Sequence, residues 1–195
     1  HKSGEVEYLT FPALEQLNIV THMVTSRFGG VSTGDCASFN FSYARDTNRE
    51  AVDENFRRAA GVFGTTSDAF VCSDQTHTTN IRRVEKEDAG KGVTKEKDYR
   101  DVDGLITNVP GLILGTFYAD CVPLLFVDPV HHAIGCSHSG WRGTVGEMGK
   151  KTVEAMREAY GSRPEDIFAA IGPSICQDCY EVGKDVAEPF EKLFS

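Results

Sequence analysis

Apolar and polar positions alternate in blocks along the chain, and the central block is the most informative. Three short apolar runs follow one another at residues 112–118, 122–127 and 133–137. Runs that are apolar throughout are typical of strands buried on both faces. We therefore expect strands here. Similar runs predict further strands at residues 20–25, 69–73, 80–85, 103–107 and 167–171.

Two other stretches have the period of an amphipathic helix. Thr47 and Glu50 have the spacing of a capping box, so a helix is expected to begin near residue 48 and to end at Gly61 or Gly64. Its predicted buried face consists of Val52, Phe56, Ala59 and Phe63.

A second helix is expected over residues 144–160, and a last one begins at residue 183. On the second helix Glu147 and Lys151 are spaced for a favourable ion pair. Its predicted buried face consists of Val145, Met148, Thr152, Ala155, Met156 and Ala159. The polar stretch 86–101 has no period, which predicts a mobile loop or an insertion near the site.

Length and composition describe an ordinary globular protein. A chain of 195 residues with 40% hydrophobic content forms one domain or two closely fused halves, and we expect a single domain. The net charge of -9 gives no reason to expect nucleic acid or an anionic membrane as partner.

The chain carries no visible targeting feature. No apolar run approaches the roughly 20 residues of a membrane helix, and no signal peptide is visible. Because the first residue is His1, we expect the natural start to be missing. The six cysteines are scattered and form no disulfide framework, which favours a reducing, cytoplasmic compartment.

Candidate chemistry gathers where predicted strands end. His77 lies between two predicted strands, Cys121 interrupts the apolar block and His138 closes it. Two imidazoles and one thiolate suit a catalytic zinc ion that leaves its fourth position for water. Asp120 could shuttle protons. Because neighbouring side chains of a strand point to opposite faces, Asp120 could instead face away from Cys121.

Two competing interpretations use the same residues. Cys121 could be a nucleophile with His138 as its base. Copper is a third possibility, but six histidines are too few for a multicopper oxidase. The Cys176–Cys179 pair lacks the second pair of a zinc ribbon and the βαβ context of a thioredoxin, so we interpret it as two structural thiols.

Two arginines are candidates for binding phosphate. Arg27 lies in a glycine-containing loop, and Arg142 stands at the expected start of the second helix together with Thr144. The N–H groups of a helix start attract anions, and a guanidinium adds a charged fork. The alternatives are a surface turn and an ordinary helix start, each with its arginine in solvent.

Seven segments in fixed order resemble one known family. They are Ser26–Ser32, Asn40–Ser42, Gln75–His77, Asp103–Thr107, Ala119–Pro123, His138–Thr144 and Gly172–Gly183 without its central residues. Together they resemble the laccase-domain or polyphenol-oxidase family, whose members are described as zinc-dependent purine nucleoside phosphorylases. The likeness runs from about residue 20 to residue 190.

The resemblance implies an α/β (α+β) fold of layered mixed β-sheets packed between helices. It implies zinc bound by His77, Cys121 and His138, and a substrate site that includes Arg27, Asn40, Arg142 and Thr144. Where the family is expected to have His-Gly, this chain has His77-Thr78. The family also continues beyond residue 195, so we expect the chain to lack a C-terminal segment.

The resemblance also implies an activity. We expect phosphorolysis of adenosine, inosine, guanosine and methylthioadenosine, with adenosine deamination alongside, in a monomer or homodimer. Related members are assigned a role in editing peptidoglycan precursors. Two alternatives remain open: a cysteine-dependent amide hydrolase acting on such a precursor, and a non-catalytic domain with a closed structural zinc.

Overall fold

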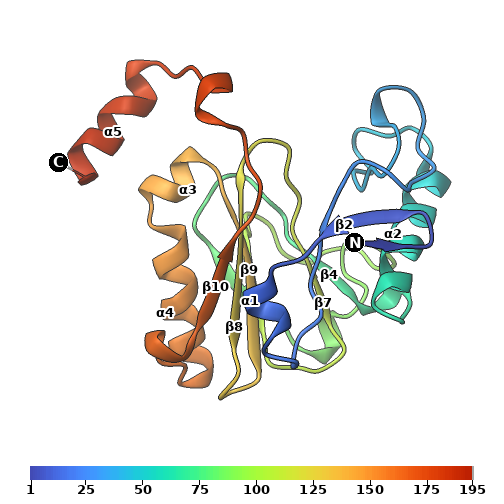
Figure 1. The fold of residues 1–195 in the computed structure, drawn as a ribbon, viewed down its shortest axis with the longest axis horizontal. Helices are drawn as coiled ribbons and strands as arrows, with labels where there is room; N and C mark the ends of the chain where they lie inside the picture. Colours follow the sequence, from blue (N-terminus) through green and yellow to red (C-terminus); the bar gives the residue numbers. More distant parts are fainter. Residues whose placement is uncertain (195) are drawn as a thin grey trace. The chain divides into compact units, whose positions relative to one another are not determined.

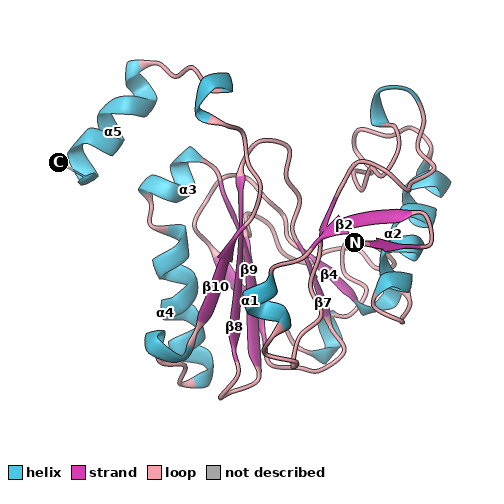
Figure 2. Cartoon of the chain, viewed as in Figure 1, coloured by secondary structure: helices cyan, strands magenta, loops and turns pink. Residues whose placement is uncertain are grey.

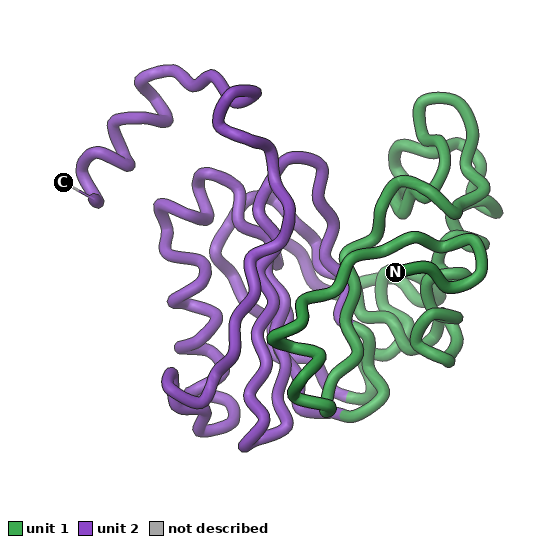
Figure 3. Tube along the Cα trace, in the orientation of Figure 1, with its two compact units in different colours: residues 1–72, 86–98, 110–113 green, residues 73–85, 99–109, 114–195 purple. Residues whose placement is uncertain are grey.

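The computed structural model describes residues 1–194 and confirms the expected α/β class. The chain divides into two compact units, which Figure 3 distinguishes by colour. The first unit comprises residues 1–72, 86–98 and 110–113, and the second comprises residues 73–85, 99–109 and 114–195. The chain crosses between the units several times, so neither is one continuous segment. We describe each unit by itself.

The first unit contains a small antiparallel sheet and one long helix. The sheet has the order β1-β2-β3, with β1 at Lys2–Ser3, β2 at Val6–Leu9 and β3 at Val24–Thr25. The predicted strand at residues 20–25 shortens to β3 because only Val24 and Thr25 pair with β2. The unit also contains α1 (Pro12–Glu15), α2 (Arg49–Val62) and β4 (Phe70–Cys72).

Helix α2 confirms the predicted helix but not its predicted cap. The side chain of Asn48, not that of Thr47, accepts a hydrogen bond from the N–H of Ala51 at 3.2 Å. On the buried face, Val52 and Phe56 are at most 1% exposed. The Phe56 ring meets the ring of Phe70 edge-on at 5.3 Å. Aromatic packing therefore joins the helix to the rest of its unit.

Residues 86–98 of the polar stretch belong to the first unit and form an ordered turn. The side chain of Lys91 is 15% exposed, and its Nζ lies 2.7 Å from Asp88 and 2.8 Å from Asp98. A weakly exposed ammonium needs such partners to offset its lost hydration. Charge pairing, which leaves no periodic pattern, therefore contributes to the order of this segment, and the expectation of a mobile loop or an insertion near the site stays a prediction.

The second unit is built on a five-stranded mixed sheet (Figure 1). Its strand order is β10-β8-β9-β6-β5, in which β5 and β6 are parallel and the other pairs are antiparallel. The bounds are β5 Ile81–Arg83, β6 Gly104–Thr107, β8 Val122–Asp128, β9 Ala133–Ser139 and β10 Phe168–Ile171. Strand β7 occupies Ile113–Gly115, where the chain passes between the units.

The register of β8 against β9 positions the candidate chemistry. Val122 pairs with Ser139 and Pro123 pairs with His138. Cys121 immediately precedes β8 and Gly140 immediately follows β9, so these two residues lie beside each other at one end of the strand pair.

Three helices belong to the second unit (Figure 2): α3 (Trp141–Val145), α4 (Met148–Tyr160) and α5 (Lys184–Phe194). The sequence predicted a single helix over residues 144–160. The helix is interrupted because Glu147 adopts a left-handed conformation with φ of 59°. Glu147 consequently pairs with Lys150, while Lys151 donates to the hydroxyl of Thr79.

Helix α4 packs on the sheet and forms the core of this unit. Its Met156 lies in a cluster with Ile106 of β6 and Phe126 of β8, all at most 5% exposed. Short 3-10 turns occupy Gly34–Cys36, Ser67–Ala69, Lys86–Asp88, Pro164–Asp166 and Gln177–Cys179. Within residues 1–194, no helix has the length and apolar character needed to cross a membrane.

Candidate metal centre

The second unit brings His77, Cys121 and His138 together. One ligand atom of each residue lies within 4.8 Å of the others. His77 comes from the connection between β4 and β5, Cys121 from the residue before β8, and His138 from within β9. Among residues 1–194, this is the one group of at least three His, Cys, Asp or Glu side chains that could hold a metal ion.

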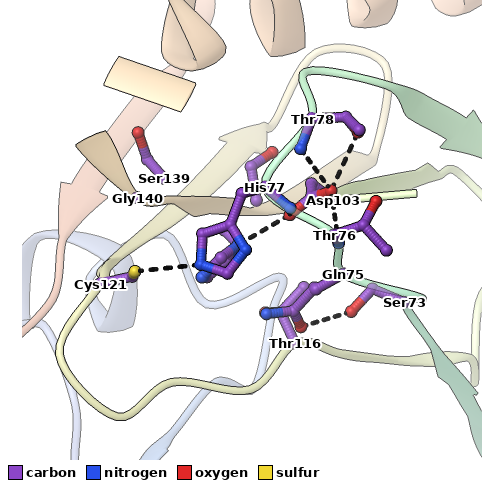
Figure 4. A network of polar contacts seen from close by, with 12 residues as sticks. Ser73, Gln75, Thr76, His77, Thr78, Asp103, Thr116, Cys121, Ser139 and Gly140 are labelled. Atoms are coloured by element: carbon purple, nitrogen blue, oxygen red, sulfur yellow. Dashed lines mark hydrogen bonds and ion pairs between the residues drawn. The ribbon is translucent and has the colours of Figure 1, made fainter. Parts of the chain in front are cut away.

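The loop that carries His77 is shaped by the carboxylate of Asp103. The backbone N–H groups of Thr76, His77 and Thr78 donate to this carboxylate at 3.1, 3.0 and 2.9 Å. The Thr78 hydroxyl donates to it as well, at 2.9 Å. His77 itself has a φ of 66°, an uncommon conformation that these hydrogen bonds stabilise. Figure 4 shows the loop wrapped around Asp103.

Asp103 also orients the second imidazole. Nδ1 of His138 donates to Asp103 Oδ1 at 2.8 Å, which leaves Nε2 of His138 free to bind a metal ion. His138 is 4% exposed and Asp103 is fully buried. Burial alone would raise the pKa of Asp103, but the hydrogen bonds from His138, Thr76 and Thr78 outweigh it, and the pKa lies below its usual value. Asp103 is therefore a buried carboxylate that holds two of the three candidate ligands.

The thiol of Cys121 faces His77, and its Sγ lies 3.9 Å from Nε2 of that imidazole. Burial, followed by the negative charges of Asp120 and Asp103, raises the pKa of Cys121 above its usual value. Without a cation the group is therefore a neutral thiol at neutral pH. A bound metal ion would supply the positive charge that a thiolate needs here.

The residue after β9 must be small for the three side chains to meet. A Cβ atom at Gly140 would lie 2.9 Å from Cδ2 of His77 and 3.0 Å from Sγ of Cys121. Because both distances are shorter than ordinary contacts, any larger residue would displace two candidate ligands. The donor set and this close approach both fit a metal ion bound by two imidazoles and one thiolate.

The other predicted site residues of the second unit lie beside the cluster in the sequence. Asp120 is exposed, and its backbone carbonyl accepts the N–H of Ile175 at 2.9 Å. Arg142 is exposed, with its guanidinium 4.3 Å from the centre of the Trp141 ring. The Thr144 hydroxyl donates to the carbonyl of Gly140 at 3.1 Å. Helix α3 begins at Trp141, so Thr144 lies within that short helix.

Arg27 and Asn40 belong to the first unit, where both side chains have internal partners. The guanidinium of Arg27 donates to the carbonyl of Ala37 from two nitrogens, at 3.2 and 2.6 Å. Asn40 accepts the N–H of Ser42 at 3.2 Å and donates to its carbonyl at 3.3 Å. Both side chains therefore shape their own loops, and their part in substrate binding stays a prediction.

The second unit has a mixed β-sheet that presents two histidines and one cysteine at one end of a strand pair. These features define an α/β protein with a three-donor candidate metal centre. Residues 21–195 match the family model described as multi-copper polyphenol oxidoreductase laccase. The chain belongs to this family, as the sequence motifs indicated.

Relatives and solved structures agree with this assignment. The chain is 41% identical over 180 residues to a protein of Deinococcus radiodurans named purine nucleoside phosphorylase. It is 40% identical over 151 residues to adenosine deaminase RL5 from an unknown prokaryotic organism. The crystal structure of the Bacillus licheniformis hypothetical protein YfiH is similar, with a TM-score of 0.87, 34% identity, and coverage of 93% of this chain and 68% of that one.

These names indicate a nucleoside-processing function in the family. The chain spans only part of the relatives' lengths. The alignments cover 92% of this chain and 66% of the Deinococcus protein, and 77% of this chain and 57% of the deaminase.

Proposed function

We propose that this protein is a zinc-dependent purine nucleoside phosphorylase that also deaminates adenosine. The observation that carries the proposal is the cluster of His77, Cys121 and His138, which offers three donors and, within residues 1–194, no fourth. Three protein ligands with an open position are the pattern of catalytic zinc, whereas structural zinc has four. The names of two relatives supply the substrate class.

Zinc is the metal that suits this donor set best. When bound, it would polarise a substrate group and make water available as a nucleophile near neutral pH. The family description refers to several copper ions, but residues 1–194 contain one cluster of three donors. A copper(II)–thiolate site would colour the protein, whereas zinc has no visible absorption, so an absorption spectrum of the protein loaded with metal under oxidising conditions distinguishes the two.

Phosphorolysis requires phosphate to attack the anomeric carbon of the nucleoside while the bond to the purine breaks. Arg142, exposed beside the cluster in sequence, is our candidate for holding the phosphate dianion. Asp120 is the candidate for moving a proton to or from the purine, since its carboxylate is exposed one residue from Cys121. His77 and His138 are fixed by Asp103 and would hold the zinc ion that activates the purine.

The cysteine-hydrolase alternative finds less support in the site. A nucleophilic cysteine needs a lowered pKa or a base close to its sulfur. Here the pKa of Cys121 is raised, and Nε2 of His77 lies 3.9 Å from its Sγ, which is longer than a nucleophile–base hydrogen bond of about 2.6–3.2 Å. Such an enzyme would stay active after chelation, whereas the metal-dependent phosphorylase would lose its activity.

The test is metal content per chain, measured together with phosphate-dependent base release from inosine and adenosine. We expect about one zinc per chain in the wild type, with base release that chelation abolishes. Cys121→Ser should lose both. Cys36→Ser is the matched control, because it removes a cysteine of the first unit that belongs to no candidate ligand group. Metal-free Cys121→Ser with full base release would refute the proposal.

A further inference from the structure

A pair of sulfurs lies outside the candidate metal centre. Cys176 and Cys179 are both exposed, in the segment that leads from β10 to α5. The sequence suggested structural thiols, but structural thiols are normally buried. Neither residue joins a metal-binding group among residues 1–194. The exposure of both thiols therefore calls for another interpretation.

The backbone of this segment holds the two cysteines close together. Residues 177–179 form a 3-10 turn, with Cys176 at its N-cap, and the N–H of Cys179 donates to the carbonyl of Cys176 at 3.1 Å. A turn closed by this hydrogen bond keeps the two Cα atoms within about 7 Å. A disulfide needs Cα atoms about 4.4–6.8 Å apart, so little backbone movement separates the dithiol from a disulfide.

We propose that Cys176 and Cys179 form a redox-active dithiol site that exchanges with low-molecular-weight disulfides. Cys176 borders an open groove of about 450 Å³, to which Tyr180 and Phe190 also contribute, so a disulfide can approach its sulfur. The hydrogen bond from the Cys179 thiol lowers the pKa of Cys176, and the same hydrogen bond raises the pKa of Cys179. Because Cys176 and not Cys179 lines the groove, Cys176 is the attacking sulfur and Cys179 the resolving one.

The reaction proceeds in two exchange steps. The thiolate of Cys176 attacks one sulfur of the small disulfide, forms a mixed disulfide and releases one thiolate. Cys179 then loses its proton and attacks Sγ of Cys176, which forms the intramolecular disulfide and releases the second thiolate. The two protons of the cysteines end on the two released thiols, so the protein is oxidised by two electrons and the small disulfide is reduced.

The segment that precedes the cysteine pair is anchored to the residues around Cys121 by two backbone hydrogen bonds. The N–H of Ile175, directly before Cys176, donates to the carbonyl of Asp120, which precedes Cys121. The segment is further fixed by the N–H of Gly172, which donates to the carbonyl of Pro123 at 2.8 Å. A disulfide would close the turn directly after these two anchor points. The proposal does not depend on the nucleoside chemistry.

The experiment equilibrates the metal-loaded 195-residue protein with buffers of oxidised and reduced glutathione, followed by alkylation, tryptic digestion and mass spectrometry. No Lys or Arg lies between Pro164 and Gly183, so both cysteines fall in one peptide. In the wild type we expect this peptide to carry an internal disulfide and no alkyl group. Cys179→Ser should accumulate glutathione on Cys176, whereas Cys176→Ser should react on the order of tenfold more slowly.

Cys36→Ser serves as the matched control and should leave the yield of the internal disulfide unchanged. The proposal fails if both cysteines of the wild-type peptide remain alkylated at every glutathione ratio. It also fails if Cys176→Ser and Cys179→Ser react at equal rates, which would show two independent surface thiols. Protection of the pair by bound zinc, removed by a chelator, would overturn it in favour of a metal site.

Discussion

At the scale of single residues, the candidate centre depends on one carboxylate that binds no metal in our proposal. Asp103 accepts hydrogen bonds from three consecutive backbone N–H groups around His77 and from the ring of His138. The three candidate ligands could be selected from the sequence because few residue types bind transition metals. Asp103 is one of 29 acidic residues, and although it begins one of the segments that resemble the family, its burial and its contacts reveal its role.

Replacing Asp103 by Asn should weaken zinc binding by about 10–100-fold, because an amide cannot accept all of these hydrogen bonds and carries no charge. The measurement is the zinc dissociation constant, obtained by competition with a chromogenic chelator. Asp101→Asn is the matched control: Asp101 is an exposed neighbour that accepts from the Thr76 hydroxyl at 2.7 Å and contacts neither imidazole. Equal zinc affinity in the wild type and in Asp103→Asn would show that the carboxylate does not position the ligands.

At the scale of secondary-structure elements, the hydrophobic period predicted helices better than it predicted where their backbone changes conformation. Helix α2 follows its hydrophobic period closely, whereas the expected helix over residues 144–160 is divided at Glu147. Glu147 has a left-handed backbone, which no sequence pattern of a glutamate marks in advance. The predicted strand at residues 20–25 was also too long, since strand length depends on the partner strand that is available.

The cap of α2 offers a direct test. Asn48→Ala should lower the free energy of unfolding by about 1 kcal/mol, because the N–H of Ala51 loses its side-chain acceptor. Thr47→Ala changes the residue that the capping-box pattern favoured and should have a smaller effect. Urea unfolding of both variants, compared with the wild type, measures the difference. A larger loss for Thr47→Ala would mean that the capping box forms in solution.

The same helix predicts a pH dependence. Hydrogen bonds from Arg57, then from Arg58, lower the pKa of Glu54 from 4.5 to about 2. A carboxyl group whose pKa is lowered in the folded state stabilises the protein above pH 4.5, and this contribution disappears as the pH falls towards 2. Because Glu54 is partly exposed, the contribution should not exceed about 1 kcal/mol.

Glu54→Gln should therefore be less stable than the wild type near neutrality, and the difference should shrink below pH 4.5 and disappear as the pH approaches 2. Urea unfolding at several pH values measures this difference. Glu50→Gln, a change on the same helix at an exposed position, is the control for the loss of one negative charge. A difference between Glu54→Gln and the wild type that does not vary with pH would contradict the assigned ion pairs.

At the scale of the whole molecule, the boundaries of the two units could not be predicted. No composition shift or linker marks the boundaries, because residues 86–98 and 110–113 return to the first unit after the second has begun. The α/β class was predictable, since buried strands and amphipathic helices alternate along the chain. All three candidate metal ligands belong to the second unit, so metal binding should act on that unit directly.

The single tryptophan, Trp141, lies in the second unit and reports on it selectively. Zinc at about 100 times its dissociation constant should raise the free energy of unfolding seen by Trp141 fluorescence by about 2.7 kcal/mol. Cys121→Ser should show no such gain. Unfolding curves recorded with zinc and with a chelator provide the measurement, and identical curves for the wild type would exclude a metal site that forms on folding.

The pairing of β8 with β9 gives the three-donor cluster one more property. Cys121 reaches Gly140 only because Val122 lies opposite Ser139. A misfolded chain with the two strands shifted by one residue would turn its strand side chains to the opposite faces and would move the thiol away from both histidines. A metal ion that needs all three donors would therefore bind only correctly aligned chains, and its occupancy would measure the fraction of molecules whose hairpin has formed without error.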